Sequence, residues 1–104
     1  MGLRSKVKGK VGEREVAALL REYGYEGRRG VQFQGGPESP DVQGLPGIHV
    51  EVKRTEGFRL WAAMAQARMD AKPGDVPTVW HRSNKQKWVV VLDAEDFLRL
   101  YRGF

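Results

Sequence analysis

Three charged residues in one short segment have the types that phosphate chemistry uses. The segment PESPDVQGLPGIHVEVKR spans residues 37–54 and contains Asp41, Glu51 and Lys53. Two carboxylates that converge form an all-oxygen site of the kind that Mg²⁺ accepts, with waters or phosphate oxygens at the remaining positions. A lysine beside them can stabilise charge that develops on a phosphate, or hold an attacking water. Whether the chain builds such a site depends on the elements that position these side chains.

Two of the three residues lie on a strand, which is indicated by the strict alternation in IHVEVKR, residues 48–54. Successive strand side chains point to opposite faces. The expected strand has an apolar and a polar face: Ile48, Val50 and Val52 against His49, Glu51 and Lys53. Lys53 then lies about 7 Å along the strand from Glu51. The same alternation also describes an ordinary half-buried strand whose polar face meets water, which is the commoner meaning of an isolated Glu-x-Lys.

A turn between Asp41 and Glu51 can bring their carboxylates together. Residues 45–47, Leu-Pro-Gly, have the composition of a turn, and residues 41–43 open a short strand before it. Such a hairpin folds Asp41 back beside Glu51, so that the two carboxylates converge from neighbouring strands. This convergence favours a metal site over a solvated row of charges.

A third carboxylate lies on an expected N-terminal helix over residues 5–24, where apolar residues recur at three- and four-residue spacing. At about 100° per residue, Glu13 points into the same arc as Val16 and Leu20, whereas Glu15 points toward solvent. A carboxylate on a core-facing stripe is costly unless it meets a cation or hydrogen-bond donors. Glu13 is therefore a candidate third acid. The alternative is that it lies one turn before the core begins and reaches water.

The remaining elements predict an α/β domain. Turn signals and hydrophobic periodicity indicate further strands over residues 28–34, 76–82 and 87–92, a helix over residues 58–71, and a last helix that Asp93 caps and that runs to Tyr101. Residues 35–40, GGPESP, form a turn cluster. The order α-β-β-β-α-β-β-α predicts one mixed central β-sheet flanked by helices, with the first and second helices on its apolar faces.

Composition limits the class of protein. A chain of 104 residues with 40% apolar and 30% charged residues is typical of one folded domain, residues 1–104. The absence of cysteine excludes a disulfide framework and a thiolate zinc site. The longest apolar run, residues 88–92, is too short to span a bilayer, and no signal peptide is visible, so we expect a cytoplasmic protein of a bacterial or phage-infected cell.

The candidate residues also occur in a familiar order. KGKVGERE (8–15), SPDV (39–42) and VEVK (50–53) together make the chain resemble the PD-(D/E)XK nuclease superfamily, and within it the archaeal and phage Holliday junction resolvases. The resemblance covers residues 8 to about 88. It places Glu13 on the acidic residue of the N-terminal helix, and Asp41 on the first metal-binding carboxylate. Gln66 resembles the glutamine that several branches carry on the helix after the motif.

What the resemblance implies is a restriction-endonuclease-like core and metal-dependent cleavage of DNA phosphodiester bonds. It assigns Glu51 as the second metal-binding carboxylate, the main-chain carbonyl of Val52 as a further ligand, and Lys53 as the catalytic lysine. Mg²⁺ or Mn²⁺ would be held by Asp41, Glu51 and Val52, with Glu13 joining directly or through water. Branched DNA in recombination or replication, above all the four-way junction, is the implied substrate.

Basic residues support a DNA partner. The chain has 18 Lys and Arg against 13 Asp and Glu, for a formal net charge of +5, and phosphate contacts from such residues supply most sequence-independent affinity. Candidate DNA-binding residues gather at element ends: Lys8, Lys10, Arg28, Arg29, Arg54, Arg59, Gln66, Arg82 and Lys85. The alternative is a scattered solvated surface.

Two functions of different class remain open, a metal-dependent endonuclease and a non-catalytic DNA-binding module on the same fold. The set of three acids and a lysine favours the enzyme, because a binding module has no need to pack carboxylates where a polyanion must approach. His49 and His81 do not form a ligand-spaced pair. His49 lies on the Glu51 face and is expected to be its hydrogen-bonded neighbour rather than a catalytic base. His81 either meets a phosphate or caps its strand.

A homodimer is also expected. A four-way junction has near two-fold symmetry and needs two matched incisions. The large apolar residues of the expected second helix could be plain core: Trp61, Met64 and Met69. Four residues of this helix nevertheless share a stripe that a small chain can hardly bury alone, which favours a dimer surface: Trp61, Met64, Ala65 and Arg68. We expect the contact on this helix or on the last hairpin.

Overall fold

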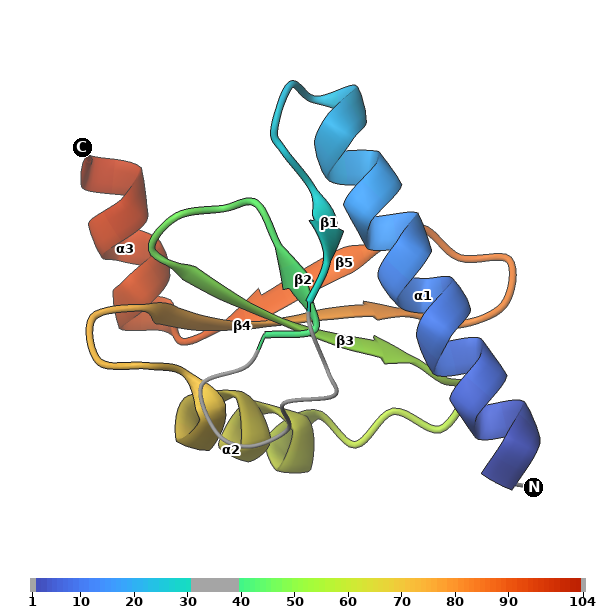
Figure 1. Ribbon diagram of the computed structural model, residues 1–104. Helices are drawn as coiled ribbons and strands as arrows, with labels where there is room; N and C mark the ends of the chain where they lie inside the picture. The colour runs from blue at the N-terminus through green and yellow to red at the C-terminus, as the bar shows by residue number, and fades with distance from the viewer. Residues whose placement is uncertain (1, 31–39, 104) are drawn as a thin grey trace.

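A computed structural model describes residues 2–30 and 40–103, and for residues 2–8 the backbone alone. The elements in chain order are α1 (Gly2–Glu22), β1 (Arg28–Arg29), β2 (Val42–Gln43), β3 (Ile48–Arg54), α2 (Leu60–Asp70), β4 (Val76–Arg82), β5 (Val89–Leu92) and α3 (Ala94–Arg102). The expected order of elements is confirmed. So is the expected α/β class, since one mixed sheet is flanked by helices (Figure 1).

The sheet has its strands in the order β1-β2-β3-β4-β5, so β3 is central. Strands β1 to β3 form antiparallel pairs, β3 and β4 run parallel, and β5 returns antiparallel to β4. Parallel neighbours need a crossover connection, and α2 supplies it between β3 and β4. The long pairing of β3 with β4 runs from Ile48↔Val76 to Arg54↔Arg82 and is the backbone of the sheet.

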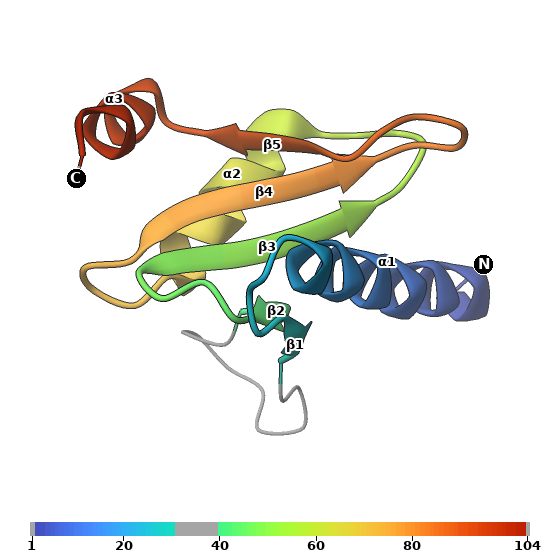
Figure 2. The ribbon, with the colours of Figure 1, turned by 90° about the horizontal axis from the view of Figure 1, so that it is seen from above.

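Helix α1 covers one face of the sheet beside β1, β2 and β3, as Figure 2 shows. Its buried residues Val16, Ala17 and Leu20 recur at helical spacing and pack on the apolar face of the hairpin and central strand. The strand residues of this core are Val42, Val50 and Val52. Their burial confirms the expected apolar face of β3. The same contacts hold α1 against the hairpin that carries Asp41.

Helix α2 covers the opposite face of the sheet (Figure 2). Ala63, Met64 and Ala67 are buried against Val79 of β4. Small residues at two of these positions let the helix lie close to β3 and β4. Met64 is only 1% exposed and belongs to this core, so the expectation that it forms part of a dimer contact is wrong. The large apolar residues that α2 exposes are Trp61 and Met69.

Helix α3 extends beyond the end of β5 (Figures 1 and 2). The structure describes all of its residues, and none of them is buried. Asp93 occupies the N-cap position as expected, but its side chain makes no capping hydrogen bond and instead pairs with Arg68 of α2. Within the described ranges, every helix is too short or too polar to cross a membrane.

Several boundaries differ from the expectations by a few residues. Helix α1 already begins at Gly2, and α2 is shorter than expected at both ends. The first strand covers Arg28–Arg29, and Gly30 after it is not in a strand. Residues 31–34 of the expected strand and residues 35–39 of the expected turn cluster lie outside the described residues. Strand β5 begins at Val89 rather than 87, and Trp88 just before it is held by its indole N–H, which donates to Glu15 of α1.

Candidate metal and phosphate site

Strand β3 presents Glu51 and Lys53 on the face that α2 covers, since their partners across the β3–β4 ladder are Val79 and His81. On this face His49 and Glu51 are buried, whereas Lys53 is half-exposed. Glu51 is only 4% exposed. A buried carboxylate costs free energy unless it gains partners, so the ordinary interpretation of a solvated Glu-x-Lys does not describe this strand.

His49 gives Glu51 its nearest partner. The imidazole Nε2 lies 3.0 Å from Glu51 Oε1, and His49 itself is 1% exposed. Both side chains project from the same face of one strand, two residues apart, where the pleat brings them together. The structure thus confirms His49 as a hydrogen-bonded neighbour, and this neighbour fixes the direction of the Glu51 carboxylate.

Asp41 is brought beside β3 by the hairpin that the sequence predicted. Its main-chain N–H donates to Val50 O at 2.9 Å, and the N–H of Val52 donates to its side-chain Oδ2 at 2.8 Å. The N–H and C=O of one strand residue point to the same edge, so the carbonyl of Val52 points to the edge of β3 on which Asp41 lies. Strand β2 begins only at Val42, opposite Val50 in the antiparallel register, so Asp41 precedes it on the side of Val52.

The electrostatics of Asp41 show that the candidate residues share one location. Its pKa is raised from an ordinary 3.8 to about 7, first by burial and then by the negative charge of Glu51. The Val52 N–H opposes this rise, Glu13 adds to it, and the Lys53 ammonium opposes it more weakly. Glu51, Glu13 and Lys53 therefore lie near enough to Asp41 for their charges to act on its carboxylate.

Glu13 reaches this edge because two glycines allow close packing. A Cβ on Gly12 would lie 2.7 Å from the Cβ of Arg54, so glycine lets α1 approach the end of β3. A Cβ on Gly30 would lie 2.1 Å from the carbonyl oxygen of Pro40, next to Asp41. The side chain of Glu13 is 14% exposed and accepts from Arg29 Nε at 3.0 Å. Arg29 is therefore the cation that Glu13, as a carboxylate on the core-facing side of α1, was expected to need.

Lys53 is held from two sides. Its Nζ donates to Gln66 Oε1 of α2 at 2.9 Å. Its main-chain carbonyl contacts the imidazole of His81 at 2.9 Å, and this ring stacks on Phe58 with centroids 4.0 Å apart. The helix after the motif thus supports Lys53 through the glutamine that the sequence singled out. An ammonium fixed in this way can face a phosphate without ordering a flexible side chain.

The donor set fits a hard divalent cation that keeps part of its water shell. Within the described part of the chain, no three His, Asp or Glu side chains form a ready-made metal cluster. Mg²⁺ does not require one, since it is usually bound through one or two carboxylates together with waters and substrate phosphates. Asp41, Glu51 and the Val52 carbonyl supply hard oxygens at one edge, and each carboxylate can accept at two oxygens. The mutual repulsion of the acids is the feature that a cation would relieve.

The candidate DNA-binding residues divide into groups. Three candidates are exposed: Lys10 of α1, Arg59 at the N-cap of α2 and Lys85 after β4. Arg29 and Gln66 are bound to Glu13 and Lys53. The side chain of Lys8 lies outside the described residues.

Two of these arginines have structural partners that the sequence did not indicate. Arg54 donates to Glu56, Asn84 and the carbonyl of Arg82, and its side chain is 12% exposed. Arg82 donates to Glu15 Oε1 at 2.7 Å. The expectation that Glu15 faces solvent is wrong, because the β4–β5 hairpin reaches over α1 and offers it both Arg82 and the Trp88 indole. Helical periodicity carries no signal for such a contact.

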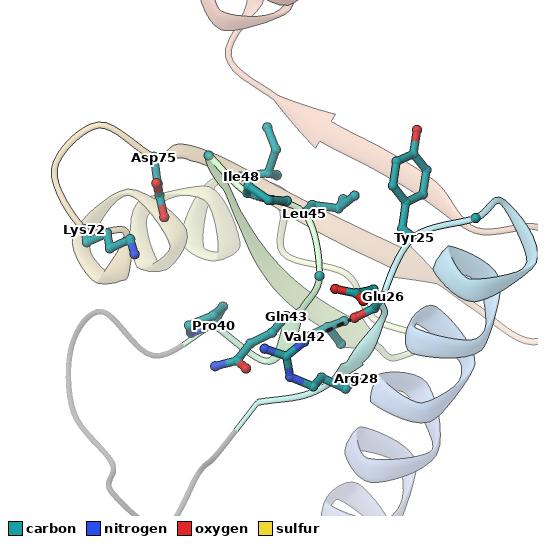
Figure 3. Close-up of a pocket in the computed structure, with 14 residues that line it drawn as sticks. Tyr25, Glu26, Arg28, Pro40, Val42, Gln43, Leu45, Ile48, Lys72 and Asp75 are labelled. Atoms are coloured by element: carbon teal, nitrogen blue, oxygen red, sulfur yellow. Dashed lines mark hydrogen bonds between the residues drawn. The ribbon is translucent and has the colours of Figure 1, made fainter.

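A separate polar pocket of about 590 Å³ lies beside β2 and the turn before β3 (Figure 3). Arg28 and Gln43 line it from the strands, and Lys72 and Asp75 from the end of α2. Pro40 touches it, but Glu13, Asp41, Glu51 and Lys53 do not line it. Arg28 is thus placed away from the other candidate DNA contacts.

No family model, curated protein or solved structure matches this chain.

Proposed function

We propose that the protein is a Mg²⁺- or Mn²⁺-dependent endodeoxyribonuclease with a restriction-endonuclease-like core. The observation that carries the proposal is the convergence of Asp41, Glu51 and Lys53 at one edge of β3, with the Val52 N–H on the Asp41 carboxylate. The order of residues that resembles the PD-(D/E)XK superfamily supports the same reading. A non-catalytic module would gain nothing from acids that repel phosphate.

Each residue has a role in this proposal. Asp41, Glu51 and the Val52 carbonyl would hold the cation, and Glu13 would join it directly or through water. When bound, the cation would lower the pKa of a coordinated water and neutralise charge on the scissile phosphate. Lys53, held by Gln66, would place its ammonium against the phosphate oxygens, where negative charge increases in the transition state.

Basic side chains near the carboxyl ends of β3 and β4 would hold the DNA backbone. Lys10, Arg59 and Lys85 are the exposed candidates there. Ligands of open α/β sheets bind outside the carboxyl ends of the strands, which is where Lys53 also lies. Branched DNA, and the four-way junction above all, is the substrate class that the resemblance favours.

Cleavage of labelled linear, nicked, flapped and four-way DNA, with and without Mg²⁺, tests the proposal. We expect metal-dependent cutting by the wild-type protein. Lys53→Ala should lower the cleavage rate by about 10²- to 10³-fold, the loss typical of removing one transition-state donor, while DNA binding stays within about twofold. Asp41→Asn should abolish cleavage and weaken Mg²⁺ binding in calorimetry.

Two matched variants serve as controls. Lys72→Ala and Asp75→Asn make the same chemical changes at the polar pocket, away from the four candidate residues, and both should cleave like the wild type. Cleavage by Lys53→Ala at the wild-type rate, or no metal-dependent cleavage of any substrate in the panel, would refute the proposed activity.

A further inference from the structure

The apolar stripe of α3 has the pattern of a helix that binds in a groove. Ala94, Phe97, Leu98 and Tyr101 follow the spacing i, i+3, i+4 and i+7 that such helices use for their anchors. Phe97 is 52% exposed, Leu98 61% and Tyr101 83%. A helix of this length is marginal in water without tertiary packing. The stripe therefore lacks the cover that an amphipathic helix normally has.

An apolar groove of about 760 Å³ lies between α1 and the β4–β5 hairpin, on the face opposite α2. Its wall is formed by Leu19 and Leu20 of α1 and by Trp80, Trp88 and Val90 of the hairpin. Tyr23 and Tyr25, at the end of α1, are exposed beside it. Helix α1 packs on β1, β2 and β3 but leaves the hairpin side of this face open.

The α3 helix cannot fill the groove of its own chain in this fold. Asp93 is the single residue between β5 and α3, and its carboxylate is bound to Arg68 of α2. Helix α2 covers the opposite face of the sheet, so this ion pair directs α3 away from the groove. To pack on the other face of the sheet in its own chain, α3 would need a longer connection after β5, since connections between elements commonly have two to six residues.

One exposed charge on each surface is complementary to the other. Glu95 in the first turn of α3 is exposed, whereas Asp96 is paired with Arg99 of the same helix. Lys87 at the groove is exposed, whereas Arg82 is paired with Glu15. Opposite charges at the rim of an apolar contact set orientation and suppress wrong partners.

We propose that α3 of one chain docks with its apolar stripe in the groove of a second copy. The exchange is reciprocal, which gives a C2 dimer with two equivalent helix–groove contacts. The hairpin that the sequence indicated as a contact thus takes part through Trp88 and Val90, whereas α2 does not. The proposal is independent of the proposed nuclease activity.

Thiol crosslinking tests the contact directly, because the chain has no cysteine of its own. Leu98→Cys and Val90→Cys replace exposed residues, on α3 and in the groove. When the two single variants are mixed, a short bis-maleimide should join one chain of each kind. Met69→Cys, exposed on α2, should give no adduct with Val90→Cys. A doubly substituted chain that crosslinks internally, as a monomer, would overturn the proposal.

Sedimentation over a concentration series provides the second readout. The wild-type protein should reach twice the monomer mass at micromolar concentrations. Leu98→Glu should raise the dimer dissociation constant at least about tenfold, since each dimer loses two buried leucines. Met69→Glu places the same charge on another exposed apolar position and should dimerise like the wild type. A wild-type monomer at all concentrations, or dissociation by Met69→Glu with Leu98→Glu unaffected, would refute the contact.

Discussion

Asp41 owes its properties to neighbours that are distant in sequence. Burial and the charges of Glu51 and Glu13 raise its pKa to about 7, although the Val52 N–H and Lys53 oppose the rise. Without a cation, the folded protein therefore favours the protonated form of Asp41 below about pH 7. Sites that hold repelling charges ready for a ligand commonly lower the stability of the fold.

This arrangement predicts how the stability of the metal-free protein depends on pH. Because the folded-state pKa of Asp41 lies above its ordinary value of 3.8, its contribution to stability is complete below about pH 4. That contribution is lost as the pH rises through about 7. The difference between 3.8 and about 7 corresponds to roughly 4 kcal/mol at about 1.36 kcal/mol per pKa unit. Urea unfolding in EDTA at pH 5 and pH 8 measures the larger part of this difference, because the smaller part is already lost between about pH 4 and pH 5.

Asp41→Asn removes this titration and keeps an oxygen that can accept from Val52. In EDTA we expect the variant to exceed the wild type in free energy of unfolding at pH 8, by up to the same few kcal/mol. The gap should shrink toward pH 5. Asp75→Asn serves as the control. A gap that is equal at the two pH values would show that Asp41 is not the titrating group.

At the scale of the element, α1 depends on Gly12 to reach the sheet. A Cβ there would meet the Cβ of Arg54 at 2.7 Å and Val52 Cγ1 at 3.3 Å, and neither atom is the far end of a flexible side chain. Gly9, one turn earlier in the same helix, has nothing within 4 Å of such a Cβ. The two glycines form a matched pair in which one fills a packing role and the other does not.

Substitution of each glycine by alanine should therefore have opposite effects. Gly9→Ala should stabilise the protein by up to about 1 kcal/mol, since alanine is the better helix former. Gly12→Ala should destabilise it by about 1–3 kcal/mol through overpacking, despite the same gain in helix propensity. Thermal unfolding of both variants measures this. Equal shifts in the same direction would show that the approach of α1 to β3 is not tight.

The sequence was most informative where an element has a period. Strands β3 and β4 were predicted at their observed bounds, Ile48–Arg54 and Val76–Arg82, because alternation is a local property. The hairpin that returns Asp41 to Glu51 was also predictable from its turn residues. The candidate acids and Lys53 were then identified from their order and spacing.

Contacts between distant elements were not predictable in this way. The periodicity of α1 gives the direction of Glu15 relative to its own helix, but not that the β4–β5 hairpin lies there with Arg82 and Trp88. For the same reason the sequence could not decide whether Met64 is core or contact surface, because the side of α2 that meets the sheet depends on the rotation of the helix about its own axis. Arg54 was expected to contact DNA, but its guanidinium donates to the carbonyl of Arg82 and to Asn84, which gives it a structural role.

At the scale of the whole molecule, the basic residues behind the net charge of +5 are not all equally available to a polyanion. Lys10, Arg59 and Lys85 are exposed on segments near the carboxyl ends of the central strands, whereas Arg29, Arg54 and Arg82 are engaged in ion pairs. Phosphate contacts release counterions, so DNA affinity depends on salt according to the number of contacts.

Arg59→Ala combined with Lys85→Ala should therefore weaken DNA binding to the same degree for every sequence. If each residue contacts one phosphate, the slope of log K against log salt should decrease in magnitude by about 1.8. Fluorescence anisotropy between low and moderate salt measures this slope. Lys72→Ala combined with Arg102→Ala removes the same charge elsewhere and should leave the slope unchanged. A smaller slope in that control would place the DNA on another surface.

Strand β2 has a further consequence for ligand affinity. It contains two residues, Val42 and Gln43, and Val42↔Val50 is the pair that aligns it with β3. Short elements of this kind, outside the main pairing of a sheet, open at a lower free energy than the core of a protein. Opening of β2 would separate Asp41 from Glu51 while the β3–α2–β4 unit stays folded. The apparent dissociation constant for a cation is then the intrinsic constant divided by the fraction of molecules in which this edge is closed. Substitutions that stiffen the hairpin would thus tighten metal binding without touching a ligand.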